Sequence, residues 1–228
     1  MNELIFLAYI ITISTASLCA LRLGKEYLIG TICVMALLVN LFVMKQITLF
    51  GVTATASDAL AVGITLSLNL MQEYYKKPAA LQTIWVSFFC MLLSILLTQL
   101  HLAYLPALLD TSTIHYHMLF KTLPRILSAS FVTYLIVQFT DAHLYSFLKE
   151  RLHGRFFIMR NYGSLACTQL LDTVLFSFLG LYKLNESFSS LHTIGTIIAV
   201  SYTIKLLVIA IAVPYVKLAK TLYPPVSV

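Results

Sequence analysis

The chain has 228 residues, of which 60% are hydrophobic and 11% are charged, and its mean hydropathy is +0.90. Water-soluble domains carry about 25% charged residues, so this chain lacks the polar surface that covers a soluble globule. The composition excludes a soluble enzyme, a disordered tail and a nucleic-acid-binding domain. It predicts a single integral membrane domain over residues 1–228.

Seven apolar runs follow one another along the chain, and a helix needs about 20 such residues to cross the hydrocarbon core. They cover residues 4–21, 27–44, 58–73, 80–100, 125–148, 162–182 and 191–215. The runs do not alternate like barrel strands, and backbone groups in lipid must bond internally. The sequence therefore predicts an all-α, polytopic bundle of about seven transmembrane helices, without strands.

Three features between and within the runs shape this prediction. The tight turn from Arg22 to Glu26 predicts that the first two helices are antiparallel neighbours. The third run is short and contains Ser, Thr and Gly, which makes it the weakest of the seven. The gap from His101 to Pro124 is long for a structureless loop, so a short interfacial helix or a lid is expected there.

The net charge of +6 is unevenly distributed over the connections. With seven spans, the loops on one side hold Arg22, Lys25, Lys76, Lys77, Lys149, Arg151, Arg155, Arg160, Lys217 and Lys220. The other side holds Lys45, Lys121, Arg125 and Lys183. Because basic residues favour the cytoplasmic side, the N-terminus is expected outside and the C-terminus in the cytoplasm.

Other residue patterns indicate no further chemistry. The four cysteines lie in apolar runs without metal-like spacing, so we interpret them as small buried residues. His115 and His117 have no third ligand nearby, so no metal site and no cofactor are expected. The start of the chain has no basic leader or A-x-A site, which predicts that the first run is retained.

Ionisable residues inside the spans are the most informative positions, because each costs about 2.5–3.5 kcal/mol to insert and faces protein or a cavity. Asp172 lies in the sixth run, Lys205 in the seventh, and Gln138 with Asp141 in the fifth. Gln169 precedes Asp172 by one turn. At a rise of about 1.5 Å per residue, Asp172, Lys205 and Gln138 each lie about 15 Å from the predicted cytoplasmic ends.

Convergence at one depth favours a binding site near the bilayer centre, where many transporters hold their substrates. The alternative is structural: Asp172 and Lys205 could form an ion pair without a ligand, and Gln138 or Gln169 could only bond a neighbouring helix. Further candidates are Asn40, Glu73 and Arg125. The last two lie near span ends, where snorkelling to the interface is normal.

Several blocks of the chain resemble the queuosine precursor transporters, also called the vitamin uptake transporter family. The early blocks are Gly24-Lys25-Glu26, residues 39–45 and residues 49–55. The later blocks are residues 125–134, residues 138–141, Arg160-Asn161, residues 169–176, and Lys205 followed nine residues later by Pro214. The chain departs from the family pattern in its third run, where Asn69 replaces a usual Asp.

The resemblance implies a multi-pass protein of the bacterial inner membrane that imports a modified purine base for tRNA modification. The base would be 7-cyano-7-deazaguanine, 7-aminomethyl-7-deazaguanine or queuine. It also implies one leading helix plus a six-helix core similar to the substrate-binding subunits of energy-coupling-factor transporters. No direct nucleic-acid partner is expected, and energising partner subunits stay open.

Three alternatives stay open beside this interpretation. The chain could be the binding subunit for another vitamin-like molecule, with an ATP-driven partner supplied by other chains. It could be a membrane enzyme, although no spacing such as H-E-x-x-H supports this, and we expect no enzyme. It could also be a structural assembly subunit, which would not need polar groups at mid-depth.

Overall fold

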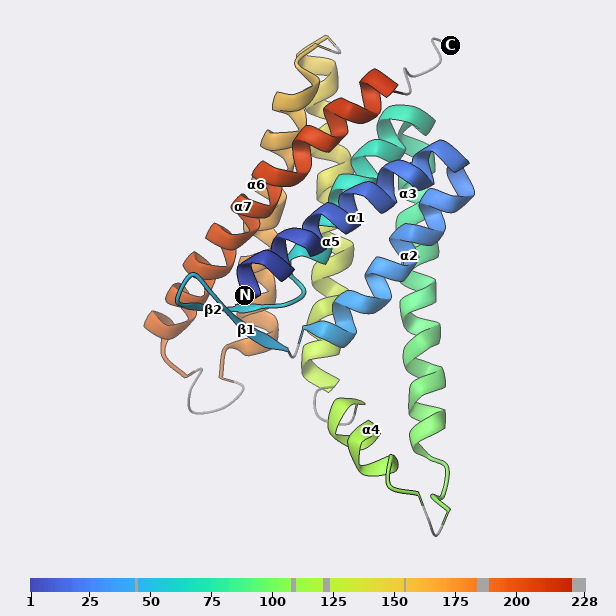
Figure 1. Ribbon diagram of the computed structural model, residues 1–228, viewed down its shortest axis with the longest axis vertical. Coiled ribbons are helices and arrows are strands. Elements are labelled where there is room, and N and C mark those ends of the chain that lie inside the picture. Colours follow the sequence, from blue (N-terminus) through green and yellow to red (C-terminus); the bar gives the residue numbers. More distant parts are fainter. Residues whose placement is uncertain (44, 108–109, 121–123, 154, 184–188, 223–228) are drawn as a thin grey trace.

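The structure is a computed structural model that describes residues 1–43, 45–107, 110–120, 124–153, 155–183 and 189–222. Within these ranges, the side chains of residues 118–119, 124–127 and 220 are not described. The long helices form one bundle, with a small hairpin near the N-terminus and a short helix projecting beyond one end (Figure 1). Their bounds are α1 Asn2–Leu23, α2 Lys25–Phe42, β1 Gln46–Leu49, β2 Val52–Thr55, α3 Asp58–Leu102, α4 Thr113–Phe120, α5 Pro124–Arg151, α6 Phe157–Phe176, the π-helix η1 Ser177–Leu181 and α7 Leu191–Leu222.

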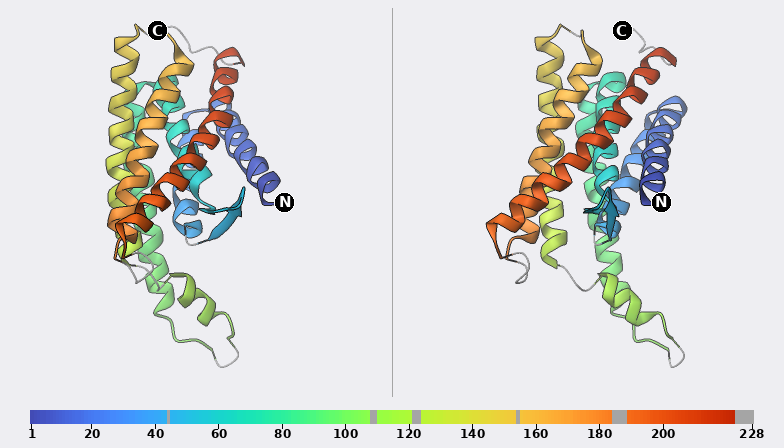
Figure 2. Two further views of the ribbon diagram at one scale, coloured as in Figure 1. Left: turned by 90° about the vertical axis from the view of Figure 1, so that its left-hand side faces the viewer. Right: turned by 60° about the vertical axis from the view of Figure 1, so that its left-hand side comes forward.

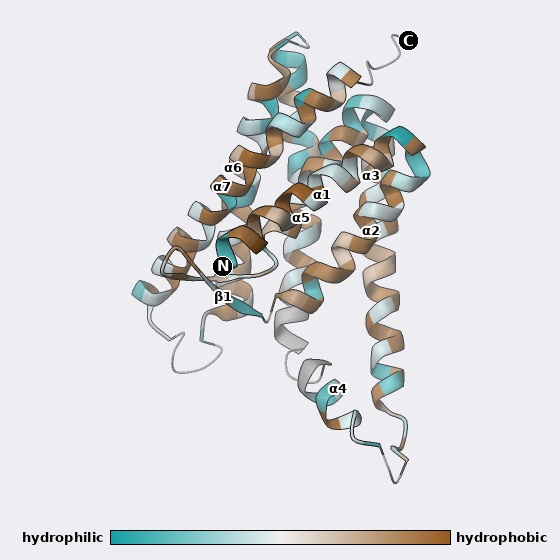
Figure 3. Cartoon of the chain, viewed as in Figure 1, coloured by the Kyte–Doolittle hydropathy of each residue, from teal (hydrophilic) through white to brown (hydrophobic). Residues whose placement is uncertain are grey.

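The predicted all-α membrane bundle is confirmed. All seven apolar runs lie on these helices, with the third and fourth runs on the two halves of α3. By length and composition, five helical stretches in the described residues could cross a membrane: α1, α2, α3, α6 with η1, and α7 up to Ala219. Hydrophobic residues dominate the long helices, while hydrophilic ones gather at the turn between α1 and α2 (Figure 3).

The 45-residue helix α3 consists of two helical segments that meet at Lys76. Lys76 has φ 70° and ψ 164°, which interrupts the helical backbone, and Pro78 opens the second segment. Proline disfavours a helical conformation in the residue before it but fits well in a first turn. The Lys76-Lys77-Pro78 sequence thus turns one continuous hydrophobic stretch into two helices.

The structure contains a β-hairpin, so the prediction that the chain has no strands is wrong for residues 46–55. Strands β1 and β2 pair antiparallel, with Gln46 opposite Thr55 and Leu49 opposite Val52. Phe50 and Gly51 form the two-residue turn, with φ of 50° and 80°. Positive φ at both turn positions is typical of tight hairpins. Four-residue strands are too short to show an alternating pattern in the sequence.

Helix α3 contacts α1, α2, α5, α6 and α7, so its first segment lies at the centre of the bundle (Figure 2). The predicted pairing of the first two helices is confirmed, because α1 packs against α2 across Gly24, which has φ 131°. Gly24 serves as the end of one helix and the start of the next. A positive φ of this size favours glycine.

The basic connections lie at one end of the bundle, as the charge pattern predicts. The turn between α1 and α2, the break in α3 and the ends of α5 and α7 all point toward the same end (Figure 1). Arg160 is a correction to that pattern, because it is fully buried at 0% exposure in the first turns of α6 rather than in a loop. A buried counter-ion, Glu73, explains its position.

At the opposite end, α4 occupies part of the gap that predicted a short helix or a lid. Asp110 precedes α4 and accepts hydrogen bonds from the Ser112 backbone N–H at 2.8 Å, from the Ser112 hydroxyl at 2.6 Å and from the Thr113 hydroxyl. The Ser112 and Thr113 hydroxyls lower the pKa of Asp110 to about 2. A charged Asp110 therefore caps the start of α4 at physiological pH.

Gly63 allows α1 to approach α3 closely. A Cβ atom at this position would lie 2.5 Å from Cγ2 of Ile13 and 3.4 Å from Sδ of Met35. We expect Gly63→Ala to destabilise the protein by about 1–3 kcal/mol through overpacking, measured as a lower thermal midpoint in detergent. Gly30→Ala and Gly195→Ala are matched controls, because nothing lies within 4 Å of their Cβ positions. An unchanged midpoint in Gly63→Ala would contradict the close packing.

Candidate functional site

A polar cavity of about 720 Å³ lies between the hairpin and helices α3, α5, α6 and α7. Most of its wall is hydrophobic, as is usual for small-molecule sites with a few orienting polar groups. Strand β2 contributes residues 52–55 to the wall, so the hairpin covers one side of the cavity. The charged and amide side chains of helices α3 to α7 that line it are Asp58, Gln138, Gln169, Asp172 and Lys205.

Lys205 and Asp172 form an ion pair that joins α7 to α6 beside the cavity. The Lys205 side chain is 4% exposed and that of Asp172 is 22% exposed, so the pair is shielded on the lysine side and open on the carboxylate side. Asp172, Lys205 and Gln138, which the sequence places at a similar depth, all line this cavity. The ion pair of the structural alternative also exists, and it forms part of the cavity wall.

Two glutamines that line the cavity meet at one buried threonine, Thr65. The Gln169 side-chain amide donates a hydrogen bond to Oγ1 of Thr65 at 3.1 Å, and the Gln138 amide lies 3.4 Å from the same oxygen. Both glutamines are buried. Oε1 of Gln169 is buried and has no hydrogen-bond partner among the described residues.

Asp58 is a second carboxylate in the cavity, and the sequence argument did not select it as a site residue. It is 5% exposed and accepts hydrogen bonds from the Ser201 hydroxyl at 3.2 and 3.3 Å. In the sequence it resembles an ordinary first-turn aspartate, which stabilises a helix start. Its position as the first residue of the weak third run was the signal that the sequence offered.

Asn40 and Arg125 differ in how they relate to the cavity. The Asn40 side chain donates to the Ala36 carbonyl at 2.9 Å and accepts from the Ser130 hydroxyl at 2.6 Å. Ser130 lines the cavity, so Asn40 lies behind the wall and positions Ser130. Arg125 lies in the first turn of α5, but its side chain is outside the described part of the structure.

Asp141 and Glu73 lie in separate clusters, and neither belongs to the described lining of the cavity. Asp141 is buried between α5 and α6, where it accepts hydrogen bonds from the hydroxyls of Ser164 and Thr168. Glu73 lies further toward the basic end. It pairs with Lys149 at 2.8 Å and Arg160 at 3.4 Å and accepts from the Tyr145 hydroxyl at 3.1 Å.

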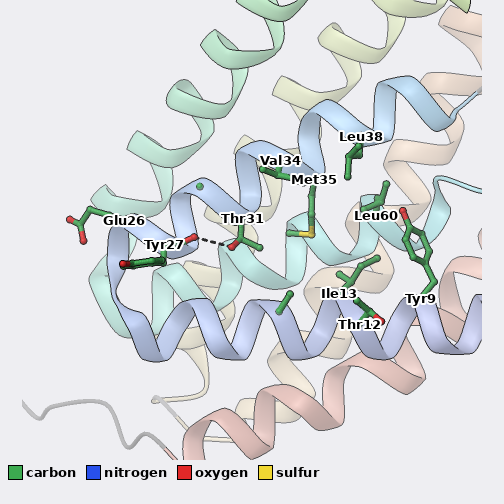
Figure 4. A pocket seen from close by; sticks show the side chains of 12 residues that line it. Tyr9, Thr12, Ile13, Glu26, Tyr27, Thr31, Val34, Met35, Leu38 and Leu60 are labelled. Carbon is green, nitrogen blue, oxygen red and sulfur yellow. Dashed lines mark hydrogen bonds between the residues drawn. The ribbon is translucent and has the colours of Figure 1, made fainter.

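A second cavity, of about 700 Å³, lies in the groove between α1 and α2 (Figure 4). Side chains such as Ile13, Val34, Met35 and Leu38 make it hydrophobic, and its described lining includes one charged side chain, Glu26. Convergent polar groups, which orient a polar ligand, are missing from this described lining. In the described residues, no group of three or more His, Cys, Asp or Glu side chains could hold a metal ion.

Several hydrophobic helices around a cavity with a few polar groups define a multi-pass membrane protein with a candidate binding site. A family model described as "Putative vitamin uptake transporter" matches residues 55–219, and the chain belongs to this vitamin uptake transporter family. It is therefore a transporter and not an enzyme. A relative from Bacillus subtilis (strain 168), named "Probable queuosine precursor transporter", is 32% identical over 189 residues, which cover 81% of this chain and 80% of the relative. No solved structure gives a significant match.

The ion pair between Lys205 and Asp172 provides a test of the cavity wall. Breaking one partner of a buried pair leaves an uncompensated charge and costs about 3–5 kcal/mol. We expect Lys205→Met and Asp172→Asn each to lower the thermal midpoint in detergent. The double variant should recover most of the loss, because neither charge is then left alone. Additive losses in the double variant would show that the two side chains are not coupled.

Proposed function

We propose that the protein imports a queuosine precursor, a 7-deazaguanine base, through the bacterial inner membrane. Family membership supports transport, and the name of the B. subtilis relative supports this substrate class. The observation that carries the proposal is the cavity of about 720 Å³, whose lining includes two carboxylates, three amides and one amine. Such a set suits a small, planar base with many hydrogen-bonding groups.

A deazaguanine presents adjacent N–H donors on one edge and a carbonyl oxygen beside them. A carboxylate accepts two parallel N–H donors well. Asp58 fits this task best, because it accepts from the neutral Ser201 hydroxyl, whereas Asp172 already pairs with Lys205. Lys205 or the Gln138 amide can donate to the carbonyl. Tyr134 and Phe176 also line the cavity, and aromatic rings stack on flat bases.

The charge distribution supports an orientation with the N-terminus outside and the basic end in the cytoplasm. The hairpin, which covers one side of the cavity, then lies away from the cytoplasmic end (Figure 1). Along α5, Asp141 and then Lys149, the partner of Glu73, follow Gln138 of the cavity toward the basic end. A solute entering beside the hairpin would leave past these residues. Which of the three precursors is carried is open to the test below.

The second candidate function is a binding subunit for another vitamin-like molecule that requires an ATP-driven partner. The family description names vitamin uptake in general, which favours keeping it. Reconstitution of the purified chain alone in liposomes separates the two candidates. Uptake of labelled base without added subunits would exclude an obligatory partner.

The substrate is tested in a bacterial strain that cannot make the base and has this chain as its only importer. Each precursor is supplied outside, and tRNA queuosine content is measured. We expect Asp58→Asn to weaken uptake about tenfold to a hundredfold, because a hydrogen bond to a charged group contributes about 1.5–3 kcal/mol. Gln138→Ala and Asp172→Asn should also reduce uptake.

Asp110→Asn is the matched control, because Asp110 caps α4 outside the bundle and should leave uptake unchanged. Expression of each variant is checked in the membrane fraction, so that loss of protein is not mistaken for loss of binding. Queuosine-free tRNA with all three precursors would reject the substrate class. Normal uptake by Asp58→Asn would remove Asp58 from the site.

A further inference from the structure

Asp141 is a buried carboxylate without a cationic partner. It is 1% exposed, and the ion pairs among the described residues do not include it. Its hydrogen bonds come from the hydroxyls of Ser164 and, at 3.1 Å, Thr168, and both reach the same oxygen, Oδ1. This contrasts with Asp172 and Glu73, which are each paired with a basic side chain.

Two sets of charged groups on the neighbouring elements pair with one another and not with Asp141. On α3 and α6, Glu73 pairs with Arg160, and Lys149 of α5 completes that cluster. Asp172 of α6 pairs with Lys205 of α7. The π-helix η1, which also packs on α5, has the sequence Ser-Phe-Leu-Gly-Leu and carries no titratable side chain. Other titratable groups on α3, α5 and α6 include Asp58, Tyr74, Tyr134, His143, Tyr145, Tyr162 and Cys167.

An ionised carboxylate in a dry, hydrophobic interior is so unfavourable that such a group takes up a proton instead. The hydroxyls around Asp141 suit both states, because a hydroxyl can donate to a carboxylate and can accept from a carboxylic acid. The hydroxyl cage, which consists of Ser164 and Thr168, therefore stabilises a protonated Asp141 without a permanent charge partner. It also allows the proton to leave without rearrangement of the backbone.

Further polar side chains lie between the hydroxyl cage and the cavity on one side, and between the cage and the Glu73 cluster on the other. Gln138 lies one turn before Asp141 on α5 and lines the cavity. Asn161 lies one turn before Ser164 on α6, and Asn69 lies on α3 one turn beyond Thr65 and one turn before Glu73. Oδ1 of Asn161 and both polar atoms of Asn69 are buried without a partner in the described residues. Buried polar atoms of this kind are where internal water binds and can relay a proton.

We propose that Asp141 is a proton-binding site that couples import of the solute to a proton gradient. The proposal rests on the transport function proposed above. A proton from water on the cavity side bonds to the Asp141 carboxylate. After the solute has left, this O–H bond breaks and the proton passes to water at the basic end. One neutral base then moves with one proton, so each cycle carries one positive charge inward.

The test uses the full chain in proteoliposomes with labelled deazaguanine base, in two assays. Counterflow exchange, without a gradient, reports solute transport alone. Accumulation under an imposed inward proton gradient reports coupling. We expect the native chain to accumulate the base and to lose accumulation when a protonophore is added. Asp141→Asn should still exchange the base but reach only the equilibrium ratio, while Asp141→Glu keeps part of the accumulation.

An infrared difference spectrum gives a readout that does not depend on transport. The carbonyl stretch of a protonated carboxylic acid should be present in the native protein and absent in Asp141→Asn. Asp110→Asn is the control, because Asp110 lies outside the bundle and should retain both the band and accumulation.

Accumulation by Asp141→Asn equal to that of the native chain would overturn the proposal, as would an unchanged carbonyl band. Native accumulation that ignores the proton gradient would overturn it as well. Absence of counterflow in the native chain for every precursor would instead reject the proposed substrate class, so the two failures are distinguishable.

Discussion

The cavity depends on the ion pair between Lys205 and Asp172, which allows a hydrophobic bundle to contain two charged side chains. Lys205 and Asp172 could each enter the bilayer only at a high cost alone, and their pairing removes most of that cost while joining α7 to α6. The pair also fixes the rotation of both helices about their axes. Gln169 of α6 and Ser201 of α7 line the same cavity as Asp58 and Gln138.

The interface of α3, α5 and α6 continues this arrangement toward the basic end in layers about one helical turn apart. On α5, Gln138 belongs to the cavity, Asp141 to the hydroxyl cage and Tyr145 to the cluster around Glu73. Ser164 and Arg160 follow the same spacing on α6. A row of polar groups, here called the polar seam, therefore runs along the bundle. At one end Lys205 pairs with Asp172, and at the other Glu73 pairs with Arg160 and Lys149. Between them, Asp141 is bonded only to hydroxyls among the described residues.

The hairpin covers the cavity end of the polar seam, and close helix contacts pack the bundle around it. Strand β2 covers the cavity with Thr53 and Thr55, which offer hydroxyls rather than charges. Gly63 brings α1 close to α3 and keeps the first segment of α3 in the centre of the bundle. At α7, Pro214 has no N–H, so the Ala210 carbonyl accepts instead from the Tyr162 hydroxyl of α6 at 3.2 Å. A proline inside a span thus adds an interhelical contact.

The sequence predicted the long hydrophobic helices and the meeting of Asp172, Lys205 and Gln138 at one cavity, because hydrophobic length and helical rise are local properties of the chain. It missed the hairpin, whose strands are too short to show alternation, and the burial of Arg160, whose counter-ion lies 87 residues away. Only the tertiary structure decided that Asp58 lines the cavity whereas Asp141 and Glu73 do not. Which face of a helix meets which neighbour depends on contacts between distant segments, and a single sequence does not encode these in any local pattern.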